Sequence, residues 1–127
     1  MSVGRLKRNM MKKLINARID LNAYLQLRKA KGYMSVSEND HLRENLFELC
    51  KEMIKEVVPL RKALTREERD ALRQAGEAVA SAAICLMTGH RDCPLYITVN
   101  VETLERCLET LTSSIQTLDA VSSHAHV

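Results

Sequence analysis

The chain has 127 residues, enough for one domain with a single core and too few for two independent ones. It contains one Phe, three Tyr and no Trp, so aliphatic side chains and Ala must fill the core, as is typical of helical proteins. The net charge of +3 conceals an asymmetry, because residues 1–31 carry a net charge of +8 and residues 32–127 one of −5. This division indicates either an anionic partner for the first segment or a contact between a basic and an acidic helix of the chain itself.

Hydropathy patterning sets the expected compartment. The longest apolar run, residues 78–87, has half the length that a bilayer crossing requires. The basic N-terminal segment has no continuous apolar stretch with a cleavage pattern, so we expect a cytoplasmic protein without a secretory signal and with reduced cysteines. A mitochondrial transit peptide, which is also basic and amphipathic, is the alternative for the first thirty residues.

The first predicted helix covers residues 3–31 and ends before Gly32. One apolar row recurs along it at spacings of three and four: Leu6, Met10, Leu14, Ala17, Leu21 and Tyr24. A second row lies about 100° further around the helix, so the helix either packs against two neighbours or pairs with its copy in a homodimer. The candidate partner-binding residues are this second row and the cations beside it: Met11, Ile15, Ile19, Arg5, Arg8, Lys12 and Arg18.

The second predicted helix covers residues 37–64, with Ser37 as its N-cap. Its expected core row is Leu42, Leu46, Leu49, Met53, Val57 and Leu60. Pro59 lacks an amide hydrogen and disfavours helical geometry at the preceding residue, so the helix should bend or stop there. Glutamates at intervals of four form an acidic row that complements the basic first helix: Glu44, Glu48, Glu52 and Glu56.

The third predicted helix, residues 66–88, has the clearest boundaries. Thr65 and Glu68 have the spacing of a capping box, and Gly89 supplies a left-handed stop. Its core row is Leu72, Ala75, Val79, Ala82 and Leu86. Beside it, a strip of small side chains should allow other helices to approach closely: Ala71, Ala75, Ala78 and Ala82.

The last predicted helix covers residues 101–121, with Asn100 as its N-cap and the most regular heptad in the chain. Residues 89–100 before it contain one short alternating stretch without an evident partner strand, so we expect a loop. The sequence therefore predicts an all-α fold, a single-domain antiparallel bundle of four helices over residues 1–121, with one longer loop at residues 89–100. Residues 122–127 should form a disordered C-terminal tail.

Four side chains near the end of the third helix and in the fourth are the candidate zinc ligands: Cys85, His90, Cys93 and Cys107. Their spacing differs from that of paired C-x2-C knuckles, and Cys is often a small buried apolar residue, so we expect no cofactor. The chain has no G-x-S-x-G motif and no Gly-rich phosphate loop, which favours a non-enzymatic protein.

Two segments resemble a known family. LRKAKGYMSVSE (residues 27–38) and CLMTGHRDCP with the following ITVN (residues 85–94 and 97–100) resemble the corresponding stretches of BssR, a small bacterial family of biofilm-formation regulators. The resemblance implies a cytoplasmic bacterial regulatory protein, and it assigns no binding or catalytic residues.

Two functions follow from these patterns. The first is a small regulatory protein that binds another protein, as a homodimer through the first helix. The alternative is a nucleic-acid-associated regulator whose basic first helix contacts phosphates, a mode of binding that weakens as salt rises. Against the alternative, the basic helix has no interleaved aromatic side chains for base stacking, and no helix-turn-helix pair is predicted.

Overall fold

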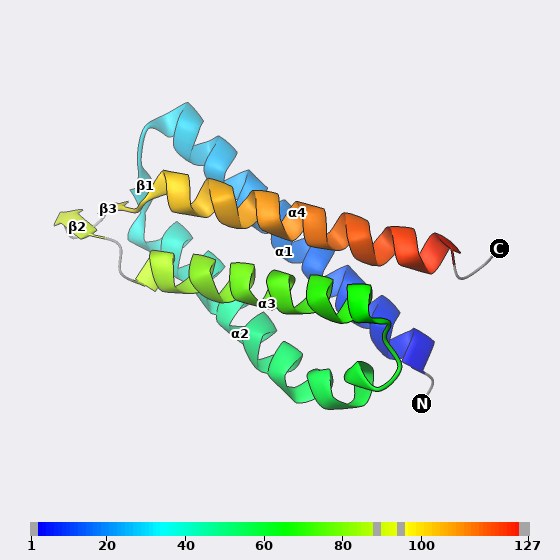
Figure 1. The fold of residues 1–127 in the computed structure, drawn as a ribbon. Helices are drawn as coiled ribbons and strands as arrows, with labels where there is room; N and C mark the ends of the chain where they lie inside the picture. The colour runs from blue at the N-terminus through cyan, green and yellow to red at the C-terminus, as the bar shows by residue number, and fades with distance from the viewer. Residues whose placement is uncertain (1–2, 88–89, 94–95, 125–127) are drawn as a thin grey trace.

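The computed structural model describes residues 3–87, 90–93 and 96–124. Its four helices run in alternating directions: α1 (Val3–Lys31), α2 (Val36–Arg61), α3 (Arg66–Met87) and α4 (Val101–His124) (Figure 1). Each helix packs against its neighbours in sequence, and α1 also packs against α4, which closes the bundle. The predicted all-α bundle of four helices is confirmed.

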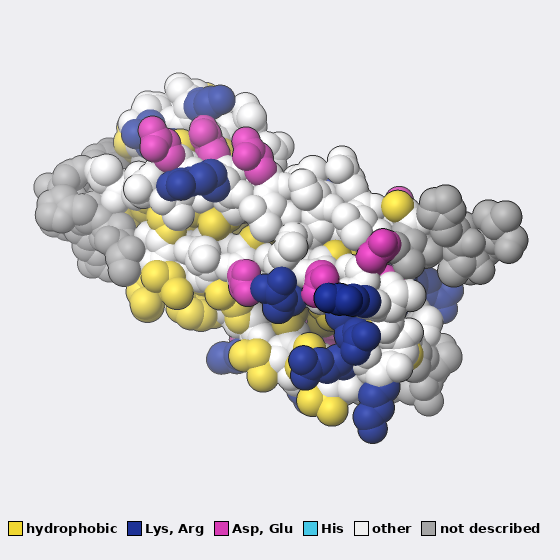
Figure 2. All heavy atoms as spheres, viewed as in Figure 1, with side chains coloured by type: hydrophobic (Ala, Val, Ile, Leu, Met, Phe, Trp, Pro, Cys, Tyr) yellow, Lys and Arg dark blue, Asp and Glu magenta, His cyan; other side chains and the backbone are white. Residues whose placement is uncertain are grey.

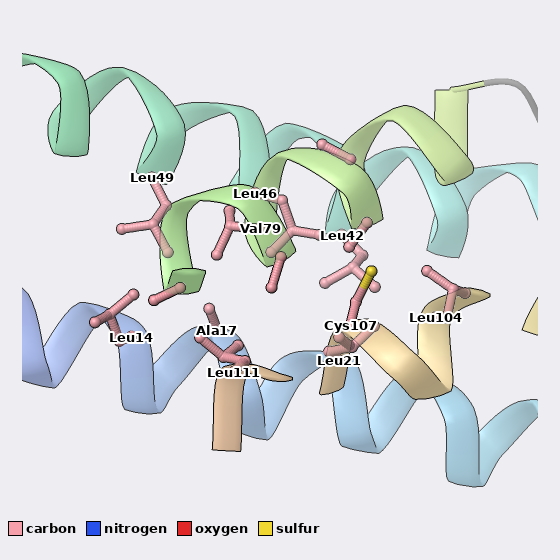
Figure 3. Close-up of a cluster of buried hydrophobic side chains, with 14 of the residues drawn as sticks. Leu14, Ala17, Leu21, Leu42, Leu46, Leu49, Val79, Leu104, Cys107 and Leu111 are labelled. Atoms are coloured by element: carbon pink, nitrogen blue, oxygen red, sulfur yellow. The ribbon is translucent and has the colours of Figure 1, made fainter. Parts of the chain in front are cut away.

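The apolar rows meet in one core between the helices (Figure 3). Leu14 of α1, Leu46 of α2 and Leu111 of α4 are almost completely buried. The shallow row of α3 is buried along its whole length, including Ala75 and Ala82, so α2 and α4 both lie close to it. The row predicted for α2 needs one correction: Val57 is 37% exposed, because it lies toward the edge between α2 and α3 and not under the helix.

A small sheet covers the end of the bundle opposite the first turn of α1 (Figure 1). It consists of β1 (Met34–Ser35), β2 (His90–Cys93) and β3 (Tyr96–Thr98), paired antiparallel in the order β1-β3-β2. Met34 pairs with Ile97 and both side chains are buried, whereas Thr98 is exposed, as alternation along a strand requires. The prediction of a loop at residues 89–100 is therefore wrong for β2 and β3: β3 pairs with β2 on one side and, on the other, with β1 in the distant connection between α1 and α2.

The helix ends follow from local side chains. The side chain of Ser35 accepts a hydrogen bond from the Glu38 amide at 3.1 Å, so Ser35 is the N-cap of α2 and the prediction of Ser37 is wrong. The helix continues through Pro59 to Arg61, three residues short of the predicted end. Gly32 has a φ of 81°, the left-handed stop expected after α1.

The predicted caps of α3 and α4 are confirmed. Thr65 and Glu68 exchange the two hydrogen bonds of a capping box, at 3.0 and 3.2 Å, and Asn100 accepts one from the Thr103 amide at 3.1 Å. The stop predicted at Gly89 lies outside the described residues. α4 continues to His124, and residues 125–127 of the predicted tail also lie outside the described residues.

Candidate interaction surfaces

A groove of about 550 Å³ lies between the second half of α2 and the first half of α3. Met53, Leu64 and Leu72 form its buried apolar base, and Ile54 and Val57 form an exposed apolar wall on α2. The remaining lining residues come mostly from the α2–α3 turn and from α3: Arg61, Arg66, Arg69, Asp70, Arg73 and Gly76. Apolar clefts of this size, with a few charged groups around them, are typical binding sites.

The groove exists because α2 has a second apolar row and α3 has a glycine opposite it. The second row follows a three-and-four spacing, about 100° around from the core row: Phe47, Cys50, Ile54 and Val57. A Cβ added at Gly76 would meet Met53 Cε at 3.4 Å, so the missing side chain at Gly76 leaves space at the base of the groove. Sequence reasoning missed this site, although the spacing of the second row could have identified it.

The groove is positively charged at the end where α2 meets α3. Figure 2 shows Lys and Arg side chains gathered over this region, beside apolar side chains that extend along α2 and α3. Arg73 Nη1 lies 3.0 Å from Glu77 Oε1, but Arg61, Arg66 and Arg69 have no carboxylate partner among the described residues. Three arginines for which the described part of the chain offers no carboxylate therefore stand around one end of an apolar groove.

The predicted apolar patch of α1 is divided by the fold. Met11 and Ile15 are half-buried and pack against the chain's own core, whereas Ile19 is 54% exposed. Of the two explanations for the second row, packing within the chain therefore holds for Met11 and Ile15. Helix α1 contacts two neighbours, α2 and α4, and Ile19 stays on the surface.

The basic residues of α1 divide in the same way. Lys13 Nζ lies 2.8 Å from Glu52 Oε2 and 3.7 Å from Glu56 Oε1, so α1 does meet the acidic row of α2. The hydrogen bond with Glu52 raises the pKa of the Lys13 ammonium. The cations predicted to bind a partner are different ones: Arg5, Arg8 and Lys12 are exposed, and Arg18 is half-buried. Arg8, Lys12 and Arg18 have no acidic partner among the described residues.

Two further ion pairs tie the ends of α1 to the rest of the bundle. Lys31 Nζ lies 2.7 Å from Glu38 Oε1 and, together with Ser35, lowers the pKa of that carboxyl. Lys7 pairs with Glu68, the buried carboxylate of the α3 capping box. These ion pairs neutralise part of the positive charge of α1 within the fold.

The structure brings two of the four zinc candidates together. Cys85 and Cys107 are buried free thiols on adjoining helices; burial raises the pKa of both, and Cys85 adds to the effect on Cys107. A zinc ion would therefore have to displace protons that the site favours. The side chains of His90 and Cys93, in β2, lie outside those described. Among the described residues, no three His, Cys, Asp or Glu side chains gather as a metal site.

No helix within the described parts of the chain is both long enough and apolar enough to cross a bilayer.

Comparison with known proteins assigns the chain to a family. The model of the family described as "Biofilm formation protein (YliH/bssR)" matches residues 1–126. The chain belongs to this family. The predicted resemblance is confirmed, and no solved structure matches the chain significantly.

The relatives within this family are similar along nearly their full length. The chain is 55% identical over 118 residues to proteins named "Biofilm regulator BssR" from Escherichia coli K12, Escherichia coli O157:H7 and Shigella flexneri. The alignment covers 93% of this chain and 93% of each relative. Family membership supports a regulatory role related to biofilms.

Proposed function

We propose that this protein is a non-enzymatic regulator of biofilm formation that acts in the cytoplasm by binding another protein. Membership of the biofilm formation family supports the regulatory role. The proposal assigns no catalytic residue and no cofactor. It also includes self-association through α1, where Ile19 is exposed and Arg5, Arg8 and Lys12 are exposed closer to the start of the helix.

The distribution of exposed apolar side chains carries the proposal. Eight large apolar residues are exposed among the described side chains, and five of them lie on α2 and α3: Ile54, Val57, Val58, Ile84 and Met87. Single exposed apolar residues are ordinary, but several on adjoining helices favour a surface that another protein covers. Protein binding explains why exposed apolar residues gather on α2 and α3. Phosphate contacts made by α1 alone do not explain it.

Photo-crosslinking in biofilm-forming host cells tests the proposal. A benzophenone amino acid is placed at Ile54 on α2, at Lys12 on α1, and at the exposed control position Gln116 on α4. We expect adducts with a protein at Ile54 or Lys12 and none at Gln116. Adducts at none of these positions, with the chain folded and present at normal levels, would show that protein binding through these surfaces is wrong.

Nucleic-acid binding is the second candidate, because Arg8 and Lys12 are exposed cations without acidic partners among the described residues. A gel-shift titration against duplex DNA and RNA at two salt concentrations tests it. Phosphate-driven binding should weaken steeply with salt, and replacing Arg8 and Lys12 by Glu should abolish it. Binding that is unchanged by these substitutions would contradict a role for α1 in contacting phosphates.

A further inference from the structure

The apolar surface around the α2–α3 groove is longer than the groove itself. Val58 is 65% exposed on α2, four residues beyond Ile54, so it stands on the same side of that helix. On α3, Ile84 and Met87 lie eleven residues beyond Arg73 and Gly76, which places them about three turns further along the same face. Both are exposed, at 52% and 54%. The arginines therefore stand at one end of an elongated apolar surface.

The dimensions of this surface match those of a helix. From Arg66 to Met87, α3 spans about 30 Å at 1.5 Å per residue, and neighbouring helices pack about 8–10 Å apart. A helix from another protein, lying between α2 and α3, would rest on the groove base at Gly76 and cover exposed residues at both ends of the surface. A small molecule confined to the 550 Å³ groove would leave Val58, Ile84 and Met87 in water.

The charge of the surface specifies one end of that helix. Arg61, Arg66 and Arg69 have no carboxylate partner among the described residues, and Asp70 is the one acidic residue that lines the groove. Arginine forms strong paired hydrogen bonds with carboxylates. A partner helix that places Asp or Glu over these three cations would complete interactions that the isolated chain leaves open, whereas Lys or Arg would be repelled.

We propose that the α2–α3 groove binds an amphipathic helix of a partner protein, with its apolar face on Ile54 and Met53 and acidic residues at the end over Arg61, Arg66 and Arg69. This inference rests on the proposed function, because it names the chemistry of the protein that the regulator binds. It uses a different face from the α1 patch around Ile19. The two sites can therefore be tested separately.

Two synthetic peptides of about 18 residues provide the first test. Both carry Leu at helical positions i, i+3, i+4 and i+7; one has three Glu in a terminal turn, and the other has three Lys there. Binding to the full chain is followed by fluorescence anisotropy. We expect the Glu peptide to bind at least about tenfold more tightly than the Lys peptide, with an advantage that shrinks as salt rises.

Substitutions in the apolar wall localise the peptide. Ile54→Gln removes an exposed side chain, so the fold should persist, and Glu-peptide affinity should fall by about tenfold or more. Leu27→Gln, on the exposed surface of α1, is the matched control and should leave the affinity unchanged. Circular dichroism establishes that both variants are folded. An equal effect of the two substitutions would place the peptide elsewhere and overturn the proposal.

Charge reversal tests the arginines directly. Arg66→Glu with Arg69→Glu should make the chain prefer the Lys peptide, and carboxylates in the first turn of α3 suit its positive dipole end, so folding should be retained. Lys29→Glu with Lys55→Glu changes the net charge equally at exposed positions that do not line the groove. This control should keep the preference for Glu. A preference that follows net charge in both double variants would overturn the site.

Two outcomes separate this inference from the proposed function. Decanoate or dodecyl phosphate that saturates the Ile54 site, while neither peptide binds, would make the groove a site for small amphiphiles and overturn the helix proposal. Protein adducts from Lys12 but not from Ile54 in the crosslinking experiment would also overturn it. That second result would leave protein binding by the regulator intact and assign it to α1.

Discussion

At the scale of single residues, Asn39 holds three helices together. Its side chain is completely buried in the first turn of α2; Oδ1 accepts a hydrogen bond from the Tyr24 hydroxyl of α1 at 3.1 Å, and Nδ2 donates to the Leu86 carbonyl at 3.0 Å. That carbonyl belongs to the last turn of α3, where it has no partner within the helix. Asn39 therefore satisfies two groups that would otherwise be buried without partners.

Asn39→Ala should lower the free energy of unfolding by at least about 2 kcal/mol, because it leaves both groups unsatisfied. Tyr24→Phe removes one of the two hydrogen bonds and should cost about 1–2 kcal/mol. Urea unfolding of the wild type, both single variants and the double variant gives the coupling between the two residues, since they share one bond. Costs that simply add would show that the Tyr24–Asn39 hydrogen bond contributes nothing to stability.

Glu68 is a second buried polar residue, and its environment makes stability depend on pH. Burial alone raises the pKa of its carboxyl, but hydrogen bonds from Lys7 and from the Thr65 amide favour the charged form, and the net pKa is lowered. A lowered pKa in the folded state means that the carboxylate stabilises the fold above its unfolded pKa of about 4.3. This contribution is lost as the pH falls through the folded pKa.

Glu68→Gln should therefore cost about 2 kcal/mol at pH 7, and the difference from the wild type should shrink as the pH is lowered from about 5 to 3. Urea unfolding at several pH values measures it. Glu67→Gln, which changes an exposed carboxyl in the same turn, should show a smaller difference throughout. A Glu68→Gln cost that is equal at pH 7 and pH 3 would contradict the ion pair with Lys7.

Which of these residues could be predicted depends on how local their contacts are. The capping box of Thr65 and Glu68 and the Asn100 cap were predictable, because each is complete within four residues. Ser35 was missed in favour of Ser37, since the two serines stand two residues apart and both precede an acidic residue at the capping distance. Asn39 was not predictable, because its partner Leu86 is 47 residues away.

At the scale of elements, apolar periodicity was sufficient for the four helices and insufficient for the sheet. Each helix buries one row of side chains, so spacing alone located it to within about three residues at each end. The strands form a sheet in which a two-residue segment, Met34–Ser35, pairs with β3 across about half of the sequence. No periodicity can be read in two residues, so the candidate strand near Ile97 lacked a visible partner.

The sequence analysis did not predict the α2–α3 groove. It placed the apolar surface for a partner on α1, because Met11, Ile15 and Ile19 form a second apolar row there with cations beside it. In α2 the equivalent second row contains Cys50 and is interrupted by charged side chains, so it was less conspicuous. The groove becomes evident when Gly76 of α3 lies opposite Met53 and the arginines at the start of α3 meet the end of α2.

At the scale of the whole molecule, the charge asymmetry is partly neutralised within the chain. Lys7, Lys13 and Lys31 of α1 pair with carboxylates of α2 and α3. Two exposed cations in the first half of α1 behave differently, because Arg8 and Lys12 find no acidic partner among the described residues. Part of the positive charge of α1 thus stabilises the fold through ion pairs, and the rest lies on the exposed surface of α1.

The oligomeric state is the prediction that depends on this outward surface. We expect two copies to pair through α1 in antiparallel orientation about Ile19. This pairing places Lys12 opposite Gln26 of the partner subunit and Arg8 opposite Ala30 of the partner subunit, whereas a parallel pair would set each cation against its own copy. The half-buried Met11 and Ile15 would add apolar contact on either side.

Ile19→Glu places a charge at the centre of that contact without disturbing the core, because Ile19 is exposed in the single chain. Sedimentation equilibrium at roughly 50 µM chain should show a dimer for the wild type and a folded monomer for the variant, since burying an unpaired carboxylate outweighs the few kcal/mol that such apolar contacts contribute. Gln116→Glu, which introduces the same charge at an exposed position on α4, should remain dimeric. A wild type that is monomeric at this concentration would make self-association through α1 wrong, and Ile19 would then be free to contact a different protein.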